Sequence, residues 1–156
     1  MRVFLMGEWP RVAVGAVVIR GNDEILLVKR KYPPSPNLWS IPGGHIEAGE
    51  PILTALFREL EEETSLKGRE AELLAITEYL RLKRDYSVKY HYVILDYLVR
   101  NAEGEPVVNE ESLGIGFFKF SDALKLELTD TTRELIHLIL TEGVGKVKHI
   151  ISVVYE

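Results

Sequence analysis

Three glutamates near the middle of the sequence have the spacing of a metal-binding face on a helix. Glu59, Glu62 and Glu63 are three and four residues apart, so on a helix of 3.6 residues per turn they fall within an arc of about 100°. Carboxylates this close repel one another by roughly a few tenths of a kcal/mol per pair. A divalent cation reverses the sign of that interaction, and hard cations prefer oxygen ligands. The spacing therefore predicts a metal site, whereas Glu61 points away and receives no role.

The composition narrows the kind of metal and of ligand. The chain contains no cysteine, so carboxylates, histidines or backbone oxygens must hold any metal. This donor set favours Mg²⁺, with Mn²⁺ as the alternative. The net charge of −5 has the wrong sign for gripping a nucleic-acid backbone, and we expect no nucleic-acid partner. A small phosphorylated ligand is compatible, because metal ions bridge phosphates to acidic side chains.

Length and hydropathy indicate one compact domain. The 156 residues, of which 46% are hydrophobic, are enough to bury a single core. The sequence has no apolar run long enough to span a bilayer, and the run at its start is too short for a signal peptide. We therefore expect a single domain over residues 1–156, located in the cytoplasm and without a membrane partner.

Strands come first among the elements that must position the glutamates. Residues 12–19 and 24–30 are apolar runs on either side of a Gly-Asn turn, which predicts a hairpin. A proline-rich loop at 31–37 precedes a helix that begins near Pro51 and ends near Ser65. The later predicted elements are strands at 73–82, 88–100 and 117–120, one helical turn at 122–126, a helix from Thr129 or Asp130 to Leu140, and a strand within 146–155. This order predicts an α/β (α+β) fold in which a mixed sheet lies between two helices.

Both ends of the sequence are predicted to add a strand. Residues from Arg2 to Met6 and from Lys148 to Tyr155 alternate well enough for β-structure. Exposed strand edges tend to pair with other strands. We therefore expect these two segments to pair with each other or, in a homodimer, with a second copy of the chain.

The three glutamates lie within a longer pattern that resembles the signature of the Nudix hydrolases. From Gly44 the sequence has five residues, Glu50, seven residues and then Arg-Glu-Leu-Glu-Glu-Glu-Thr-Ser-Leu, ending at Leu66. Every specified position is matched except one, because Ser65 stands where the family has glycine. Serine in a left-handed helix end costs roughly 1 kcal/mol, unless the chain leaves the helix by another path. We expect this departure to affect stability more than chemistry.

The resemblance implies a Nudix-type α/β/α sandwich and a metal site within it. Glu59 and Glu63 are implied to be metal ligands, and Glu62 a further ligand or a base that acts on water. A backbone carbonyl of Gly43 or Gly44 is implied to complete the metal shell.

Supporting and catalytic roles also follow from the resemblance. Glu50 is implied to pair with Arg58 and so brace the loop against the helix. In this family the base that activates water often lies on a loop before a later strand. Here the candidates are Glu111 and Glu110, with Glu111 preferred; the alternative is a pair of solvated loop acids.

The implied reaction is hydrolysis of the pyrophosphate linkage in a nucleoside diphosphate derivative. Residues 90–96 and 128–133 look like those of ADP-ribose pyrophosphatases, which split ADP-ribose into AMP and ribose 5-phosphate. A nucleoside triphosphate pyrophosphatase that removes oxidised nucleotides is the alternative, and a non-catalytic nucleotide sensor is a third reading, which the intact glutamates disfavour. The candidate substrate-binding residues are Arg30 and Arg81 for phosphate and Trp39 and Tyr79 for base stacking, with surface exposure or core packing as the alternative for each.

Overall fold

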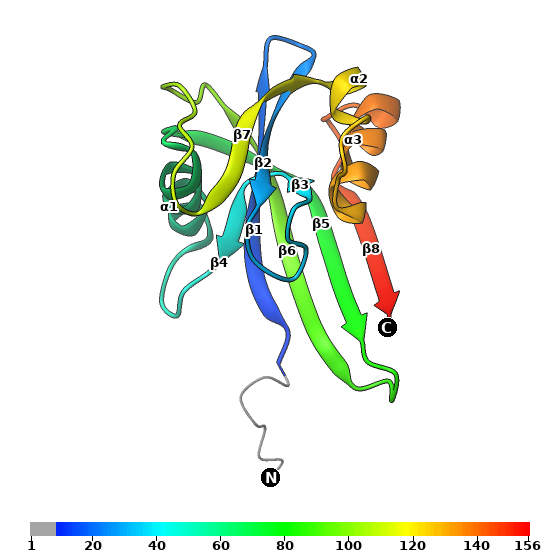
Figure 1. The fold of residues 1–156 in the computed structure, drawn as a ribbon. Coiled ribbons are helices and arrows are strands. Elements are labelled where there is room, and N and C mark those ends of the chain that lie inside the picture. Colours follow the sequence, from blue (N-terminus) through cyan, green and yellow to red (C-terminus); the bar gives the residue numbers. More distant parts are fainter. Residues whose placement is uncertain (1–8) are drawn as a thin grey trace.

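Two antiparallel strands open the fold as the predicted hairpin. In the computed structural model, which describes residues 9–156, β1 (Arg11–Arg20) turns through Gly21 into β2 (Glu24–Arg30) (Figure 1). Ile19 faces Ile25 in their register. Residues 13–18 of β1 are buried or nearly so, because this strand lies inside the sheet and both of its faces are covered.

The remaining elements include two short strands, β3 and β4, that the sequence analysis did not predict; the others follow the predicted order, with two corrections to their bounds. They are β3 (Trp39–Ser40), β4 (Gly43–His45), α1 (Ile52–Thr64), β5 (Glu70–Leu82), β6 (Val88–Arg100), β7 (Ser112–Lys119), α2 (Phe120–Ala123), α3 (Asp130–Glu142) and β8 (Lys148–Tyr155). The strand predicted at 117–120 begins earlier, at Ser112, because its two glycines, Gly114 and Gly116, weaken the β-pattern without breaking it. The helical turn predicted at 122–126 begins at Phe120.

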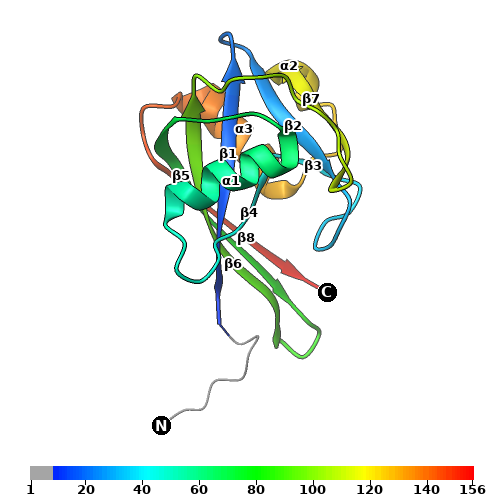
Figure 2. The ribbon, with the colours of Figure 1, turned by 90° about the vertical axis from the view of Figure 1, so that its left-hand side faces the viewer.

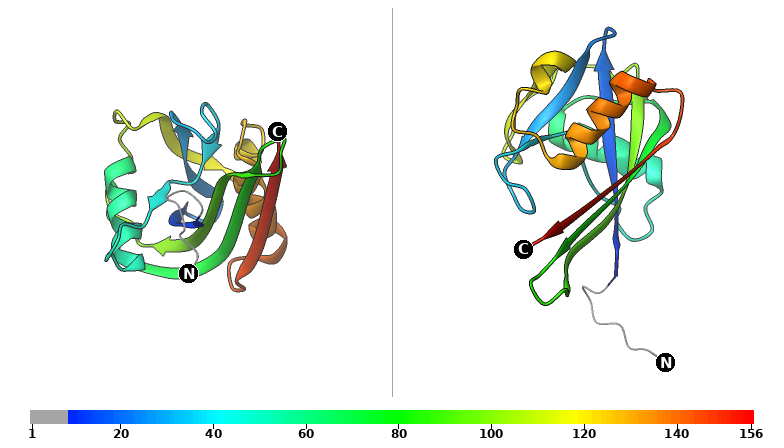
Figure 3. Two further views of the ribbon diagram at one scale, coloured as in Figure 1. Left: turned by 90° about the horizontal axis from the view of Figure 1, so that it is seen from below. Right: turned by 90° about the vertical axis from the view of Figure 1, so that its right-hand side faces the viewer.

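The strands form a mixed and strongly curled sheet. Its order is β3-β2-β1-β6-β5-β8, while β4 pairs with β1 and β7 with β2. β1 and β6 are parallel, as are β5 and β8, whereas β5 and β6 form a long antiparallel pair. Figure 3 shows β5, β6 and β8 extending together beyond the body of the fold. This architecture agrees with the predicted α+β class.

The last strand adds an intrachain pairing that the sequence analysis did not predict. β8 pairs in parallel with β5 of the same chain, with Ala75 opposite Lys148 and Leu82 opposite Tyr155. β8 is the last strand in the order of the described sheet, so pairing of its other edge with the N-terminal segment or with a second subunit stays a prediction. The strand predicted from Arg2 to Met6 lies outside the described residues.

Helices cover both faces of the sheet (Figures 1 and 2). Val14, Ala16 and Val18 of β1 belong to the core beneath α1, whereas Val17 belongs to the core beneath α3. The alternation follows from the two-residue period of a strand. α1 and α3 thus pack on opposite faces and fix the positions of the residues between them. In the part of the chain that is described, no helix has the length and apolar character to cross a membrane.

The end of α1 shows how serine replaces the glycine of the signature. Ser65 adopts the left-handed conformation, with φ of 68° and ψ of 4°. Its N–H donates to the carbonyl of Glu61 at 2.9 Å, which closes the last turn. Of the two predicted outcomes, the chain has the strained one: the serine adopts the left-handed conformation and bears the steric cost of a Cβ there.

Candidate active site

A pair of glycines brings α1 against the strand that precedes it. Gly43 and Gly44 lie in β4, which pairs with the middle of β1. The Gly43 N–H donates to Glu63 Oε2 at 2.8 Å. A Cβ built on Gly44 would overlap the carboxylate of Glu59. The missing side chain of Gly44 therefore makes room for the carboxylate of Glu59, whereas that of Gly43 allows the close approach of β1, and Glu63 is hydrogen-bonded to the Gly43 N–H.

Burial and mutual repulsion perturb the same two carboxylates. Burial raises the pKa of Glu63 to about 7, against the hydrogen bond from Gly43, and the charge on Glu59 raises it further. Burial also raises the pKa of Glu59, while Arg58 opposes the shift. Such a pair is costly as two bare anions, and a nearby cation would relieve both the desolvation and the repulsion.

Arg58 holds the loop before α1 as the resemblance implied. Its Nε and Nη2 donate to the two carboxylate oxygens of Glu50 at 2.6 and 2.8 Å, and Nη2 also reaches the carbonyl of His45 at 3.2 Å. The hydrogen bonds from Arg58 lower the pKa of Glu50 to about 2. Nη1 donates to Glu59 at 2.9 Å and to Glu62 at 3.1 Å. Arg58 is fully engaged with protein groups and acts as a brace.

The remaining acidic candidates take different positions. Glu62 is half exposed, and its nearest cation is Arg58. The carboxylate of Glu111 is close enough to raise the pKa of both Glu59 and Glu63. Asn109 places it: its amide donates to the carbonyl of Glu62 at 2.6 Å and accepts from the Glu111 N–H at 2.9 Å. The charges of both Glu62 and Glu111 raise the pKa of Glu59, whereas of these two only Glu111 also raises the pKa of Glu63.

Glu110 lies on the same loop but carries no comparable contact to the group. Its carbonyl accepts a hydrogen bond from Lys31 at 3.0 Å. The side chain is exposed and does not figure among the charges that shift the pKa of Glu59 or Glu63. The two candidates are thus separated by their electrostatic influence, because only Glu111 raises the pKa of Glu59 and Glu63.

The available donor atoms suit a hard divalent cation, although the side chains do not yet form a complete set of metal ligands. Within residues 9–156, no three His, Asp or Glu side chains already form a group that could hold a metal ion. Two partly buried carboxylates nevertheless lie beside the β4 backbone, and all the donors are oxygens, which Mg²⁺ and Mn²⁺ prefer. The chemistry of the residues therefore fits the implied metal.

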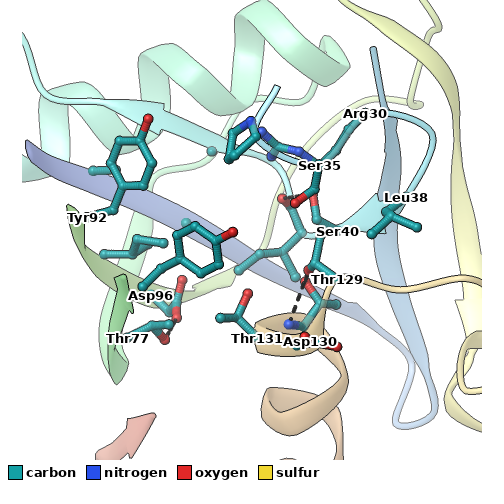
Figure 4. A pocket seen from close by; sticks show the side chains of 18 of the residues that line it. Arg30, Ser35, Leu38, Ser40, Thr77, Tyr92, Asp96, Thr129, Asp130 and Thr131 are labelled. Carbon is teal, nitrogen blue, oxygen red and sulfur yellow. Dashed lines mark hydrogen bonds between the residues drawn. The ribbon is translucent and has the colours of Figure 1, made fainter. Parts of the chain in front are cut away.

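A cavity of about 350 Å³ adjoins these carboxylates. Its walls come from β1, β5 and β6, from the loop after β2 and from the start of α3 (Figure 4). Gly43, Gly44 and His45 lie at its border with the glutamates. Burial and the charges of Arg11 and Arg30 lower the pKa of His45, so its ring stays neutral more readily. The size is sufficient for a nucleoside-sized ligand.

Three of the four predicted substrate-binding residues line this cavity. Arg30, Tyr79 and Arg81 are part of its wall. Arg30 has a buried Nε without a hydrogen-bond partner in the described chain. Arg81 is held on one side by Pro34, whose carbonyl is 3.4 Å from Nη1, and its Nε lies 3.2 Å from Glu156 without hydrogen-bond geometry. Arg30 is thus the cation with the most capacity left for a ligand.

Trp39 is a correction to the predicted binding residues. Its ring packs edge-on against Phe118, with centroids 5.1 Å apart, and it contributes to the core beneath α3. It also closes over Gly114, and it is not among the residues of the cavity wall. The aromatic ring is therefore used for packing, because β3 directs it toward β7 and the core.

One polar group in the cavity was missed by the sequence analysis. Asp96 is only 4% exposed, and its Oδ2 accepts a hydrogen bond from Thr77 Oγ1 at 2.7 Å. Burial raises the pKa of Asp96 to about 7. The signal was present, because this is a single acidic residue inside the otherwise apolar and aromatic run of β6.

Comparison with known proteins identifies the family to which this architecture belongs. Residues 9–139 match the model of the NUDIX domain. The chain is 32% identical over 117 residues to an ADP-ribose pyrophosphatase of Methanocaldococcus jannaschii, covering 75% of this chain and 66% of that protein. The chain therefore belongs to the Nudix family.

Solved structures share the fold. The crystal structure of a MutT NUDIX hydrolase from Burkholderia pseudomallei matches with a TM-score of 0.73 and 35% identity, over 83% of this chain and 98% of that one. A bifunctional NMN adenylyltransferase/ADP ribose pyrophosphatase from Francisella tularensis, complexed with AMP and a manganese ion, matches with a TM-score of 0.68 and 25% identity, over 89% of this chain and 43% of that one.

The curated relatives are longer than this chain. It spans 66%, 23% and 37% of the length of the first three. Some of these relatives are named RNA pyrophosphohydrolases or mRNA cap hydrolases. Family membership is therefore shared across proteins named for different substrates.

Proposed function

We propose that this protein is a metal-dependent pyrophosphohydrolase that cleaves a nucleoside diphosphate derivative, with ADP-ribose as the first substrate to test. The observation that carries the proposal is the contact of Glu59 and Glu63 with the glycines of β4 at the border of a nucleoside-sized cavity. A ligand in that cavity would place its phosphates beside the carboxylates. The similarity to an ADP-ribose pyrophosphatase supports the choice of substrate.

Each part of the site has a proposed task. Glu59 and Glu63 hold Mg²⁺ or Mn²⁺ together with a backbone carbonyl of Gly43 or Gly44, and Glu62 is a further ligand at the exposed side. When bound, the metal supplies positive charge that neutralises the pyrophosphate oxygens and acidifies water. Arg30 binds a phosphate through its unpaired guanidinium N–H.

The proton of the attacking water needs an acceptor. Glu111 is the proposed base, because it lies near Glu59 and Glu63 and its loop is fixed by Asn109. Tyr79 and Tyr92 offer a platform for the base, since their rings stack with centroids 6.3 Å apart at the cavity wall.

A second candidate is a nucleoside triphosphate pyrophosphatase. The observation that favours it is the similarity to a MutT hydrolase over nearly the whole length of that protein. Both reactions use the same carboxylates, and they differ in whether the leaving group is a sugar phosphate or pyrophosphate.

The decisive experiment is a parallel assay of the purified protein with Mg²⁺, using ADP-ribose and the four nucleoside triphosphates. AMP and ribose 5-phosphate as products would establish the first candidate, whereas a monophosphate and pyrophosphate would establish the second. Glu63→Gln is expected to abolish turnover, and Glu61→Gln, an exposed change on the same helix, is expected to leave it intact. No turnover of any substrate, combined with retained nucleotide binding, would contradict the enzymatic proposal and favour a sensor.

A further inference from the structure

The buried carboxyl of Asp96 is unusual because, within residues 9–156, no positively charged group contributes to its pKa shift. The structure gives it one hydrogen-bond partner, the hydroxyl of Thr77 at 2.7 Å. Burial raises the pKa of Asp96 and is the larger influence, whereas the hydrogen bond from Thr77 lowers it. A carboxyl placed in a sheet interior with a single partner is destabilising, and a group retained under that cost commonly serves recognition.

The surrounding chain leaves room for this carboxyl. Asp96 lies opposite Gly15 in the parallel pairing of β6 and β1. A Cβ on Gly15 would overlap Asp96 Oδ1 and press on Ile41. Glycine in the middle of a buried strand is destabilising relative to alanine. β1 thus has a glycine, which is a poor β-former, at the position where a side chain would displace the carboxyl of Asp96.

The position of the carboxyl is suited to contact with a ligand. Asp96 and Thr77 both line the cavity beside the glutamates. Figure 4 shows them on one side of the cavity, with Thr129 and Asp130 at the start of α3 on the other. The Thr129 side chain caps the N–H of Thr132 at 3.3 Å, which leaves the N–H groups of Asp130 and Thr131 without a partner within the helix. A flat heterocycle between these walls would meet an acidic oxygen at one edge and N–H donors at another.

We propose that Asp96, held by Thr77, is the residue that selects the nucleobase of the substrate, by hydrogen-bonding to an edge of the base that carries an N–H. This inference rests on the proposed function, because it takes the ligand to be a nucleotide. Its role is specificity and not the chemical step, since the metal-binding carboxylates lie on a different element. Discrimination by a buried polar group is strong, because a base without the matching group leaves that polar group unpaired.

The test measures binding without relying on turnover. In Mg²⁺ buffer, calorimetry with AMP, GMP, CMP, UMP and ribose 5-phosphate gives the ranking of bases and the affinity without a base. The wild type is expected to rank the four nucleotides over at least about tenfold in Kd. Asp96→Val is expected to remove this ranking while ribose 5-phosphate binds as before. Thr77→Val, which keeps the shape, is expected to weaken the preferred nucleotide by about threefold.

Asp96→Asn keeps the test decisive if the valine variant does not fold. It is isosteric, and its amide offers a different donor pattern, so the order of preference among the bases is expected to change. An unchanged order in Asp96→Asn would overturn the proposal, as would an equal loss for nucleotides and ribose 5-phosphate, or a wild type without base preference. If the protein ranks the bases but hydrolyses no substrate, only the proposed function is refuted. If it hydrolyses a substrate but changes at Asp96 do not alter the ranking, only this inference is refuted.

Discussion

The carboxylate of Glu59 lies directly against the Cα of Gly44, in the space that a side chain would occupy. Gly44→Ala should therefore push the carboxylate away from β4. We expect at least a tenfold loss of Mn²⁺ affinity, measured by electron paramagnetic resonance, with a similar loss of turnover. Gly145→Ala is the matched control, because a Cβ there meets nothing within 4 Å. Unchanged Mn²⁺ binding in Gly44→Ala would show that this contact does not form the metal site.

The brace between Arg58 and Glu50 should give a stabilisation that depends on pH. The folded-state pKa of Glu50 is about 2, below the ordinary value of 4.5, so the contribution is present above about pH 4.5 and is lost as pH falls toward 2. Denaturant unfolding of Glu50→Gln and the wild type should differ at pH 6 and converge near pH 2. Glu72→Gln, which breaks the exposed pair with Arg100, should change stability little at either pH. A constant difference for Glu50→Gln across this range would contradict the prediction.

Asp96 should produce the opposite pH dependence. Its folded-state pKa is about 7, above the ordinary value of 3.8, so between these values the folded chain keeps a proton that the unfolded chain releases. Stability should therefore decrease as pH rises through this window, by at most about 1.4 kcal/mol per pH unit. In unfolding experiments from pH 4 to 8, the wild type should lose stability relative to Asp96→Asn. Parallel curves would show that the carboxyl is ionised throughout.

Ser65→Gly should stabilise the protein. The left-handed conformation at φ of 68° carries a steric cost for serine that glycine does not have, and we expect a gain of about 1 kcal/mol in the free energy of unfolding. Ser65→Ala keeps the Cβ and should show no such gain. Urea unfolding measures the stability of both variants. A glycine variant less stable than the wild type would mean that interactions of the serine side chain stabilise the protein by more than the backbone strain destabilises it. Turnover should be equal in all three proteins.

Variants of Glu110 and Glu111, the two neighbouring acids of the loop before β7, should distinguish a catalytic role from an effect of surface charge. Glu111→Gln should reduce turnover by about 100-fold or more, which is typical for loss of a general base. Glu110→Gln removes the same charge one residue away and should leave turnover within about twofold, because Glu110 is not among the charges that shift the pKa of Glu59 or Glu63. Equal effects of the two variants on steady-state rates would assign the loss to overall charge.

The sequence by itself determined the local elements and the chemistry of the motif. The spacing of Glu59, Glu62 and Glu63 needs only the period of a helix, and the pairing of Glu50 with Arg58 follows from the resemblance. The hairpin, α1, α3 and the long strands were predicted because their apolar periods are strong within short windows.

Only the tertiary structure decided which of these residues meet. The charge of Glu111 reaches Glu59 and Glu63, because the loop before β7 folds back onto α1 through Asn109. The ring of Trp39 goes to the core and not to the cavity, and β8 pairs with β5 of its own chain. Asp96 becomes a buried group of the cavity because β1 presents Gly15 opposite it. Contacts between distant segments depend on how the sheet is ordered, and local periodicity carries no information about that order.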